Sequence, residues 1–275
     1  MSREAAGLRL ELRRLALAYA DARALIRGQD FYESLGRDNP VVLFRTTERG
    51  NGNFIPASYD AIRREPSAME RTRKRHTQLG SLPTDFRASA LEMDSSNSSD
   101  ALLMNIFCYP GVGSDALCDL LGVERWSEPT FGQKCRVPGE KASWSTELDM
   151  CIGDGLSVEA KLTEQTFTRK PEPSVRKYRD LDVVFDVGAL PQQDGAFESY
   201  QLIRNVLAAF ARRARFLLIH DRRRPDLRAH WGRIQRAIKI PQLGARCSAI
   251  EWQAVAGAVP EELGRFLAEK YGIVP

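Results

Sequence analysis

The stretch from residue 146 to residue 164, TELDMCIGDGLSVEAKLTE, constrains the fold more than any other part of the chain. Apolar and polar residues alternate on both sides of a Gly-Asp-Gly tripeptide, which is typical of two strands joined by a tight turn. Side chains two residues apart lie on the same face of a strand, so Glu147 and Asp149 share one face. Glu159 and Lys161 share a face of the second strand for the same reason.

The two polar faces coincide if the strands pair as a hairpin, and three carboxylates and one ammonium then meet in one patch. Like charges that close together are costly unless a cation lies between them. Carboxylate oxygens suit Mg²⁺ or Mn²⁺ rather than Zn²⁺. The pattern therefore predicts a metal site with Asp149, Glu159 and Glu147 as ligands. The alternative is a half-exposed strand pair in which Glu159 and Lys161 form an ordinary surface ion pair.

Asp149 followed by Glu159-Ala160-Lys161 resembles the two acidic motifs of the PD-(D/E)xK nuclease superfamily. Further along, the hexapeptide YQLIRN that begins at Tyr200 is similar to the QxxR signature found in part of that superfamily. Its Gln201 and Arg204 lie one turn apart on a predicted helix. The chain from residue 98 to residue 271 resembles a bacterial branch of restriction-endonuclease-like proteins.

The resemblance implies an α/β fold with a restriction-endonuclease-like mixed central sheet flanked by helices, and a Mg²⁺- or Mn²⁺-dependent nuclease that hydrolyses DNA phosphodiester bonds. Asp149 and Glu159 would bind the metal ions, and Lys161 would orient or deprotonate the attacking water. Gln201 and Arg204 would position phosphate or hold the carboxylates.

Two other functions stay open at this point. One is a nucleic-acid-binding protein that keeps the fold without cleaving. The other is a metal-dependent enzyme that acts on a small phosphate ester, although the chain shows no Gly-rich phosphate loop.

Asp100 stands where the sequence departs from the bacterial branch. In that branch the helix before the catalytic strands begins Ser-Ser-Gln, whereas here Ser98-Ser99 is followed by Asp100. An acid in the first turn is favoured by the helix dipole, and we expect this role for Asp100 rather than that of a metal ligand.

Composition indicates the class of protein and its cellular compartment, but not the reaction. The 275 residues are 43% hydrophobic and 28% charged, as in a soluble globular protein. No apolar run approaches a membrane span, and no signal-peptide core follows the first residues. The five cysteines form no CxxC pair, and their odd number favours reduced thiols in the cytoplasm.

The net charge of +4 is mild, so a site for DNA must come from local clusters of cations. Such clusters occur at 63–75, 169–179 and 222–228, and for the first of them a solvated helix face is the alternative. The candidate phosphate contacts are Arg71, Arg73, Lys74, Arg75, Arg176, Lys177, Arg222 and Arg223.

The remaining pattern predicts an N-terminal helical and basic elaboration over residues 1–94 and a nuclease-like core over 95–275, which we expect to form one compact unit. The strands are expected at 131–137, 147–152, 157–162, 215–220 and 247–252. The helices are expected at 2–27 (ended by Gly28), 58–79, 98–108, 197–213 and 260–271. We expect the helices at 98–108 and 197–213 to pack against the sheet. The first helix fits a surface helix on the core, and a homodimer seam or a nucleic-acid contact is the alternative.

Overall fold

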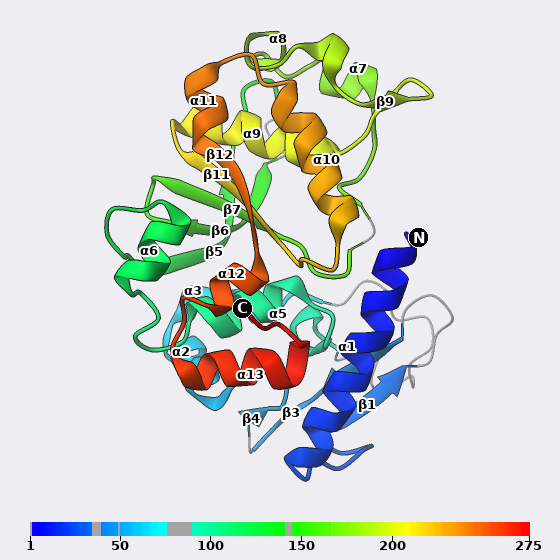
Figure 1. Cartoon of the computed structure of the whole chain (residues 1–275), viewed down its shortest axis with the longest axis vertical. Coiled ribbons are helices and arrows are strands. Elements are labelled where there is room, and N and C mark those ends of the chain that lie inside the picture. The colour runs from blue at the N-terminus through cyan, green and yellow to red at the C-terminus, as the bar shows by residue number, and fades with distance from the viewer. Residues whose placement is uncertain (1, 35–39, 49, 76–89, 141–144, 165) are drawn as a thin grey trace. The chain divides into compact units, whose positions relative to one another are not determined.

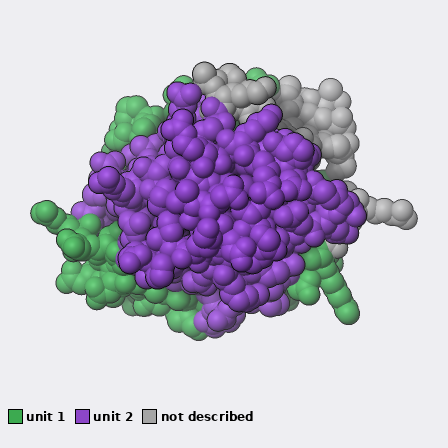
Figure 2. All heavy atoms as spheres, turned by 90° about the horizontal axis from the view of Figure 1, so that it is seen from above, with its two compact units in different colours: residues 1–125, 252–275 green, residues 126–251 purple. Residues whose placement is uncertain are grey.

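The computed structural model describes residues 2–34, 40–48, 50–75, 90–140, 145–164 and 166–275. The chain forms two compact units, which Figure 2 distinguishes by colour. Unit 1 comprises residues 1–125 and 252–275, and unit 2 comprises residues 126–251. The division at 94/95 into two domains stays a prediction, because compact units need not coincide with domains.

Unit 2 is built on a mixed sheet of five strands in the order β12-β11-β7-β6-β5 (Figure 1). β5, β6 and β7 pair antiparallel, whereas β11 pairs parallel with both β7 and β12. The mixed sheet and its strands are confirmed close to the predicted bounds. The strands are β5 Pro129–Cys135, β6 Thr146–Ile152, β7 Leu156–Ala160, β11 Arg215–His220 and β12 Cys247–Glu251.

The β6–β7 hairpin forms as the alternating pattern predicts. Ile152 pairs with Leu156 across the turn, and Met150 pairs with Val158. Gly153 has a φ of +53°, a left-handed conformation that glycine adopts without strain. The hairpin therefore fixes the register that places Asp149 and Glu159 on one face of the sheet.

Helices connect the parallel strands, because a parallel connection needs a long crossover. The helices between β7 and β11 are α7 Glu172–Val175, α8 Leu181–Val184 and α9 Tyr200–Arg212. Those between β11 and β12 are α10 Pro225–Arg236 and α11 Pro241–Arg246. The same segment contains the short strands β8 Lys170–Pro171, β9 Gln192–Gln193 and β10 Ala196–Phe197, and the 3-10 turn η2 Val187–Ala189.

The core of unit 2 lies between one face of the sheet and these helices. Phe216 and Leu218 of β11 belong to the same buried cluster as Leu202, Ile203 and Val206 of α9. Helix α9 contacts β6, β7 and β11, which confirms the expected packing of the 197–213 helix on the sheet. Because β11 is buried from Phe216 to His220, it is a central strand with both faces covered, as its apolar run predicts.

Unit 1 combines helices with short strand pairs. Its helices are α1 Arg3–Ala22, α2 Pro56–Arg64, α3 Pro66–Thr72, α5 Ser99–Phe107, α6 Asp115–Leu121, α12 Trp252–Ala256 and α13 Glu261–Tyr271, with the 3-10 turn η1 Glu92–Asp94. Its strands are β1 Phe31–Ser34, β2 Val41–Phe44, β3 Thr46–Thr47 and β4 Gly50–Asn51. The expected packing of α5 against the sheet of unit 2 stays a prediction, since the two units are not placed relative to one another.

Two helix predictions in unit 1 are wrong at their ends. Helix α1 ends at Ala22 rather than at residue 27, because Ala24 turns to a φ of +51°. The basic stretch 58–79 contains two helices, because Pro66 has no amide hydrogen and holds the preceding Glu65 in an extended conformation. Residues 76–79 of that stretch lie outside the described residues.

All five cysteines are free, and four of them are buried. Burial raises the pKa of Cys151 to about 11, so this thiol stays protonated at neutral pH. None of the helices in the described ranges combines the length and the hydrophobicity that a membrane span requires.

Candidate active site

Glu159 lies at the centre of the candidate site. It belongs to β7, which is buried along its whole length, and the glutamate itself is 3% exposed. Its two carboxylate oxygens have different partners: Oε1 lies 2.7 Å from Nζ of Lys161, and Oε2 accepts a hydrogen bond of 2.6 Å from Nδ2 of Asn205. A carboxylate this deeply buried is stable only when such groups replace its water.

Asp149, on the neighbouring strand β6, contacts the backbone beside Glu159. Its Oδ2 accepts a hydrogen bond of 2.9 Å from the backbone NH of Ala160, the residue between Glu159 and Lys161. The aspartate is half-buried, in contrast to the fully enclosed Glu159. The structure therefore brings the three residues of the predicted motif together at the end of β7.

Lys161 is 6% exposed and is held from several directions. Its backbone NH donates to the carbonyl of Ile219 in β11 at 2.9 Å, which continues the β7–β11 pairing by one residue. Burial by itself lowers the pKa of Lys161, but the attraction of Glu159, Glu164 and Asp149 outweighs it and raises the pKa above its ordinary value. The three carboxylates therefore favour the ammonium form of Lys161.

Asn205 is a site residue that the sequence prediction missed. It is fully buried on α9, within the hexapeptide that was recognised through Gln201 and Arg204. The missed signal was an amide at a buried position of an otherwise apolar helix face, since a buried amide needs a partner.

Glu164 was also missed, because it lies in the loop after β7 rather than on the alternating face. Its Oε2 accepts a hydrogen bond of 2.7 Å from the NH of Leu162. The fully buried Arg224 donates to the carbonyls of Leu162 and Glu164 at 3.2 Å and 2.8 Å, and pairs with Asp226. This arginine therefore fixes the loop that places Glu164 near Lys161.

Gln201 and Arg204 lie on α9 as predicted. The backbone NH of Gln201 donates to the carbonyl of Phe167 at 2.9 Å and anchors the start of the helix. The guanidinium of Arg204 lies 5.5 Å from the ring centre of Tyr200. The catalytic role of both residues stays a prediction, and α9 contacts Glu159 through Asn205.

The carboxylates near Lys161 are of the ligand type that divalent cations prefer, but their arrangement does not form a ready metal site. Glu159, Glu164 and Asp149 surround one ammonium, so this group carries an excess of two negative charges. Glu147 is half-buried on β6, on the same strand face as Asp149. Within the described residues no group of three or more His, Cys, Asp or Glu side chains is arranged to hold a metal ion. Nζ of Lys161 lies 2.7 Å from Oε1 of Glu159, so a cation that binds this oxygen must displace the ammonium.

The predicted phosphate contacts differ in their surroundings. Arg71 is 7% exposed and pairs with Asp100 at 2.7 Å, an arrangement that does not favour contact with DNA. Lys74 pairs with Glu92 at 3.0 Å, and Arg73 and Arg75 are exposed. Since these four residues belong to unit 1, their position relative to the carboxylates is not determined.

In unit 2 three of the four predicted phosphate contacts pair with an acidic side chain. Arg176 pairs with Glu172 at 2.9 Å, and Lys177 is exposed. Arg222 pairs with Glu251 at 2.7 Å, and Arg223 pairs with Asp221 at 2.6 Å. That the segments 63–75, 169–179 and 222–228 together form one DNA-contacting surface stays a prediction.

Asp100 takes the role expected for it in the helix, since it lies in the first turn of α5 behind the capping Ser98. It is 4% exposed and pairs with Arg71, so the acid joins α5 to α3 by a buried ion pair. The structure supports a structural role for this residue.

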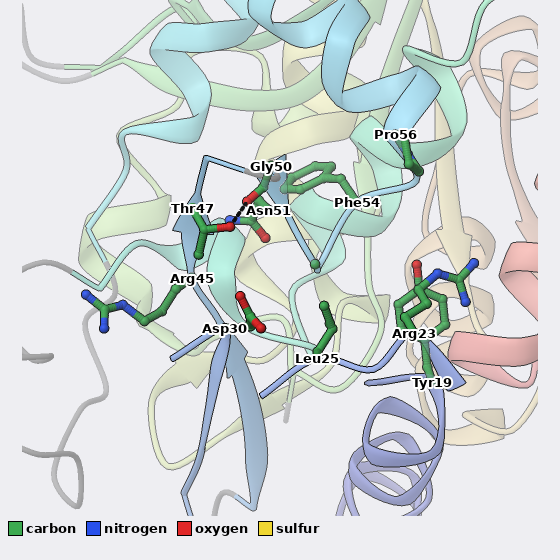
Figure 3. Close-up of a pocket in the computed structure, with 11 residues that line it drawn as sticks. Tyr19, Arg23, Leu25, Asp30, Arg45, Thr47, Gly50, Asn51, Phe54 and Pro56 are labelled. Atoms are coloured by element: carbon green, nitrogen blue, oxygen red, sulfur yellow. Dashed lines mark hydrogen bonds between the residues drawn. The ribbon is translucent and has the colours of Figure 1, made fainter. Parts of the chain in front are cut away.

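Unit 1 contains a hollow of about 130 Å³ that none of the predicted site residues lines (Figure 3). Thr47 and Asn51 of the β3–β4 hairpin face it together with Asp30, Arg23 and Tyr19. Arg23 lies 3.8 Å over the ring of Tyr19, and the Asp30 carboxylate accepts from the NH of Ile26, which explains these polar groups as parts of the local fold.

Unit 2 is thus an α/β unit whose mixed central sheet brings a buried glutamate–lysine pair and a half-buried aspartate together. A family model described as "Restriction Endonuclease associating with ARP" matches residues 15–272. The chain belongs to this restriction-endonuclease-like family. The comparisons with curated proteins and with solved structures find no match.

Proposed function

We propose that unit 2 is a Mg²⁺-dependent nuclease, or a Mn²⁺-dependent one, that hydrolyses DNA phosphodiester bonds. The observation that carries the proposal is the buried pair of Glu159 and Lys161, with Asp149 bound to the backbone between them, in a chain of a restriction-endonuclease-like family. Membership of that family supports nuclease activity, and the geometry supports the particular residues.

Asp149 and Glu159 would hold the divalent cation, with Glu147 as a further ligand. A bound divalent cation lowers the pKa of its water and neutralises charge on the scissile phosphate. Asn205 keeps the Glu159 carboxylate in one orientation, and Arg224 keeps the loop that carries Glu164 in place. Both groups therefore preorganise the carboxylates before substrate arrives.

Lys161 would contribute as an ammonium. Because its pKa is raised, it can donate hydrogen bonds to the attacking water or to a phosphate oxygen. As an ammonium beside Glu159, it would supply positive charge to offset the charge of the phosphate.

A protein that binds nucleic acid without cutting it is the alternative. The observation that favours it is the Lys161–Glu159 contact, because an internal cation can take the place of a metal ion.

The homodimer and the cytoplasmic location remain proposals. The free cysteines support the cytoplasmic location.

The test is a cleavage assay on the purified chain with single-stranded, duplex and branched DNA in the presence of Mg²⁺ or Mn²⁺. We expect cleavage of at least one substrate and its loss on chelation. Binding of divalent metal, followed by calorimetry, separates the outcomes. If the protein binds no divalent metal and cuts none of the substrates, the result contradicts the nuclease proposal, and the DNA-binding alternative remains.

A further inference from the structure

Several arginines stand at one edge of unit 2, where α9 and α11 end and β11 begins. They are Arg212, Arg213, Arg215 and Arg246, and we call them the arginine edge. The guanidinium of Arg246 donates from Nη1 to the backbone carbonyl of Arg213 at 2.9 Å, which joins the ends of the two helices. Phe216 pairs with Cys247 in the parallel ladder, so the arginines that precede these two residues are neighbours across the strands. Three elements therefore bring their arginines to the same edge of the sheet.

The arginine edge carries more positive charge than its surroundings neutralise. Among the described residues, Arg212 alone of the four pairs with an acid, the exposed Asp154 at 3.8 Å. The last carbonyls of α9 and α11 attract cations as well, and each helix end contributes about half a negative charge. Four guanidinium groups against the one acid and the two helix ends leave an excess of about two positive charges. A polyanion is the ligand that offsets such an excess.

The predicted phosphate contacts of the same unit differ from the arginine edge in this respect. Arg176, Arg222 and Arg223 each pair with a carboxylate at 2.6–2.9 Å, so a phosphate must compete with that acid. Arg213 is exposed and has no acidic partner in the described part of the chain. A phosphate therefore reaches its guanidinium without displacing a carboxylate.

The local conformation at Arg213 does not account for an arginine. Its φ is +58°, the left-handed conformation in which a helix commonly ends and which glycine adopts at least cost. A residue with a Cβ is mildly strained there. The fold thus bears a small conformational cost at a position that presents an exposed guanidinium.

Two elements measure the distance from the arginine edge to the candidate active site. Arg215 pairs with Leu156, which lies three residues before Glu159, or about 10 Å along β7. Arg212 lies seven residues after Asn205, again about 10 Å along α9. The rise of duplex DNA is about 3.4 Å per base pair, so this distance corresponds to about three base pairs. Both places therefore fall within the length of one short duplex.

We propose that the arginine edge binds phosphates of duplex DNA on one side of the bond that unit 2 cuts. Arg213 and Arg215 contact the phosphates, and Arg246 holds the end of α9 in place through the Arg213 carbonyl. The inference rests on the proposed function for the identity of the polyanion. It assigns DNA contact to a surface different from the segments 169–179 and 222–228.

The test is equilibrium binding of a fluorescein-labelled DNA duplex at several salt concentrations, in chelator so that no cleavage occurs. Arg213→Gln with Arg215→Gln keeps Arg246 and the carbonyl that it holds. This double variant should weaken binding on the order of tenfold at about 0.1 M salt. Its salt slope should be smaller by about 1.8, because each lost phosphate contact removes about 0.9.

Lys134→Gln with Arg265→Gln is the matched control, because it removes two exposed cations from elements away from the arginine edge. Lys134 lies on β5, which is separated from β11 by two strands, and Arg265 belongs to unit 1. The control should bind the duplex as the wild type does. A change of slope in the arginine variant no larger than in the control would overturn the proposal.

Arg213→Gly tests the same surface in a variant that suits the left-handed backbone, so we expect it to fold even if the double variant does not. Its thermal unfolding temperature should be at least that of the wild type. Its salt slope should be smaller by about 0.9. An unchanged slope in this folded variant would also overturn the proposal.

Kinetics separate this proposal from the nuclease itself. In a wild type that cleaves, the double variant should raise KM about tenfold and keep kcat within about twofold, because the arginine edge lies away from the reacting atoms. A lower kcat at unchanged KM would contradict the proposal. Duplex binding through the arginine edge without cleavage would support the surface and contradict the nuclease. Cleavage with an affinity that does not depend on these arginines would overturn the surface and leave the nuclease standing.

Discussion

The side-chain amide of Asn205 donates a hydrogen bond of 2.6 Å to Oε2 of Glu159, and both residues are buried. This bond joins α9 to β7 at the point where Lys161 leaves the strand. It gives α9 a physical role in the candidate site, which is to fix the orientation of a buried carboxylate.

Asn205→Leu should destabilise the protein by about 1–3 kcal/mol, because it leaves a buried carboxylate oxygen without its donor. Urea unfolding measures the change. Gln235→Leu is the control, since the Gln235 amide is exposed and donates to the neutral carbonyl of Cys247 at 3.3 Å. A loss of stability in Asn205→Leu no larger than in the control would contradict the role of this bond.

Lys270 of α13 predicts how the stability of unit 1 depends on pH. Its ammonium is fully buried, donates to the Asn53 side chain at 2.6 Å and lies among four aromatic rings at 4.9–5.4 Å. Burial, and secondarily the charge of Arg23, lowers its pKa well below 10.5.

Between the lowered pKa and 10.5 the unfolded chain binds more protons at Lys270 than the folded chain does. The free energy of unfolding therefore rises with pH across this window and falls as pH decreases, by at most about 1.4 kcal/mol per pH unit. Lys270→Met should remove this contribution, so that stability changes less between about pH 7 and about pH 10 than in the wild type. Lys239→Met, which removes an exposed lysine, should keep the wild-type slope. Equal slopes in all three proteins would show that Lys270 is charged when folded.

The buried pair of Arg71 and Asp100 predicts a stability effect in place of a DNA-binding effect. Asp100→Asn should cost about 3–5 kcal/mol, because the guanidinium of Arg71 then lacks its charge partner in the interior. The double variant Arg71→Met with Asp100→Leu should recover most of that loss. Thermal unfolding compares them, and a double variant less stable than Asp100→Asn would contradict the argument.

The sheet was predictable because its signal is local. Alternation around the Gly-Asp-Gly turn determines which side chains share a face, and the apolar run of β11 indicates a central strand. Asn205 and Glu164 were not predictable in this way. Their roles depend on contacts between segments far apart in sequence, or on a loop fixed by Arg224, and no periodicity encodes such contacts.

The errors in unit 1 have a similar origin. Pro66 indicates a break in the basic stretch 58–79, because proline disrupts a helix interior, but the prediction gave more weight to the run of cations. Arg71 looked like a phosphate contact because cations on a helix are usually exposed, and only the fold shows that this one meets Asp100. The position of the basic segments of unit 1 relative to the carboxylates depends on how the two units are arranged.

The central claim is that Asp149, Glu159 and Lys161 form one metal-dependent cleavage site. The most direct measurement is the rate of DNA cleavage by Asp149→Asn at saturating Mg²⁺, with Asp154→Asn as the matched control. Asp154 lies exposed in the turn of the same hairpin, so its substitution removes the same charge from the same element.

We expect Asp149→Asn to lower the cleavage rate by roughly 10²–10⁴ and to lose calorimetric metal binding, because it removes a cation ligand. Asp154→Asn should cleave DNA and bind metal as the wild type does. Cleavage by Asp149→Asn at the rate of Asp154→Asn, with metal binding retained, would contradict the assignment of the site.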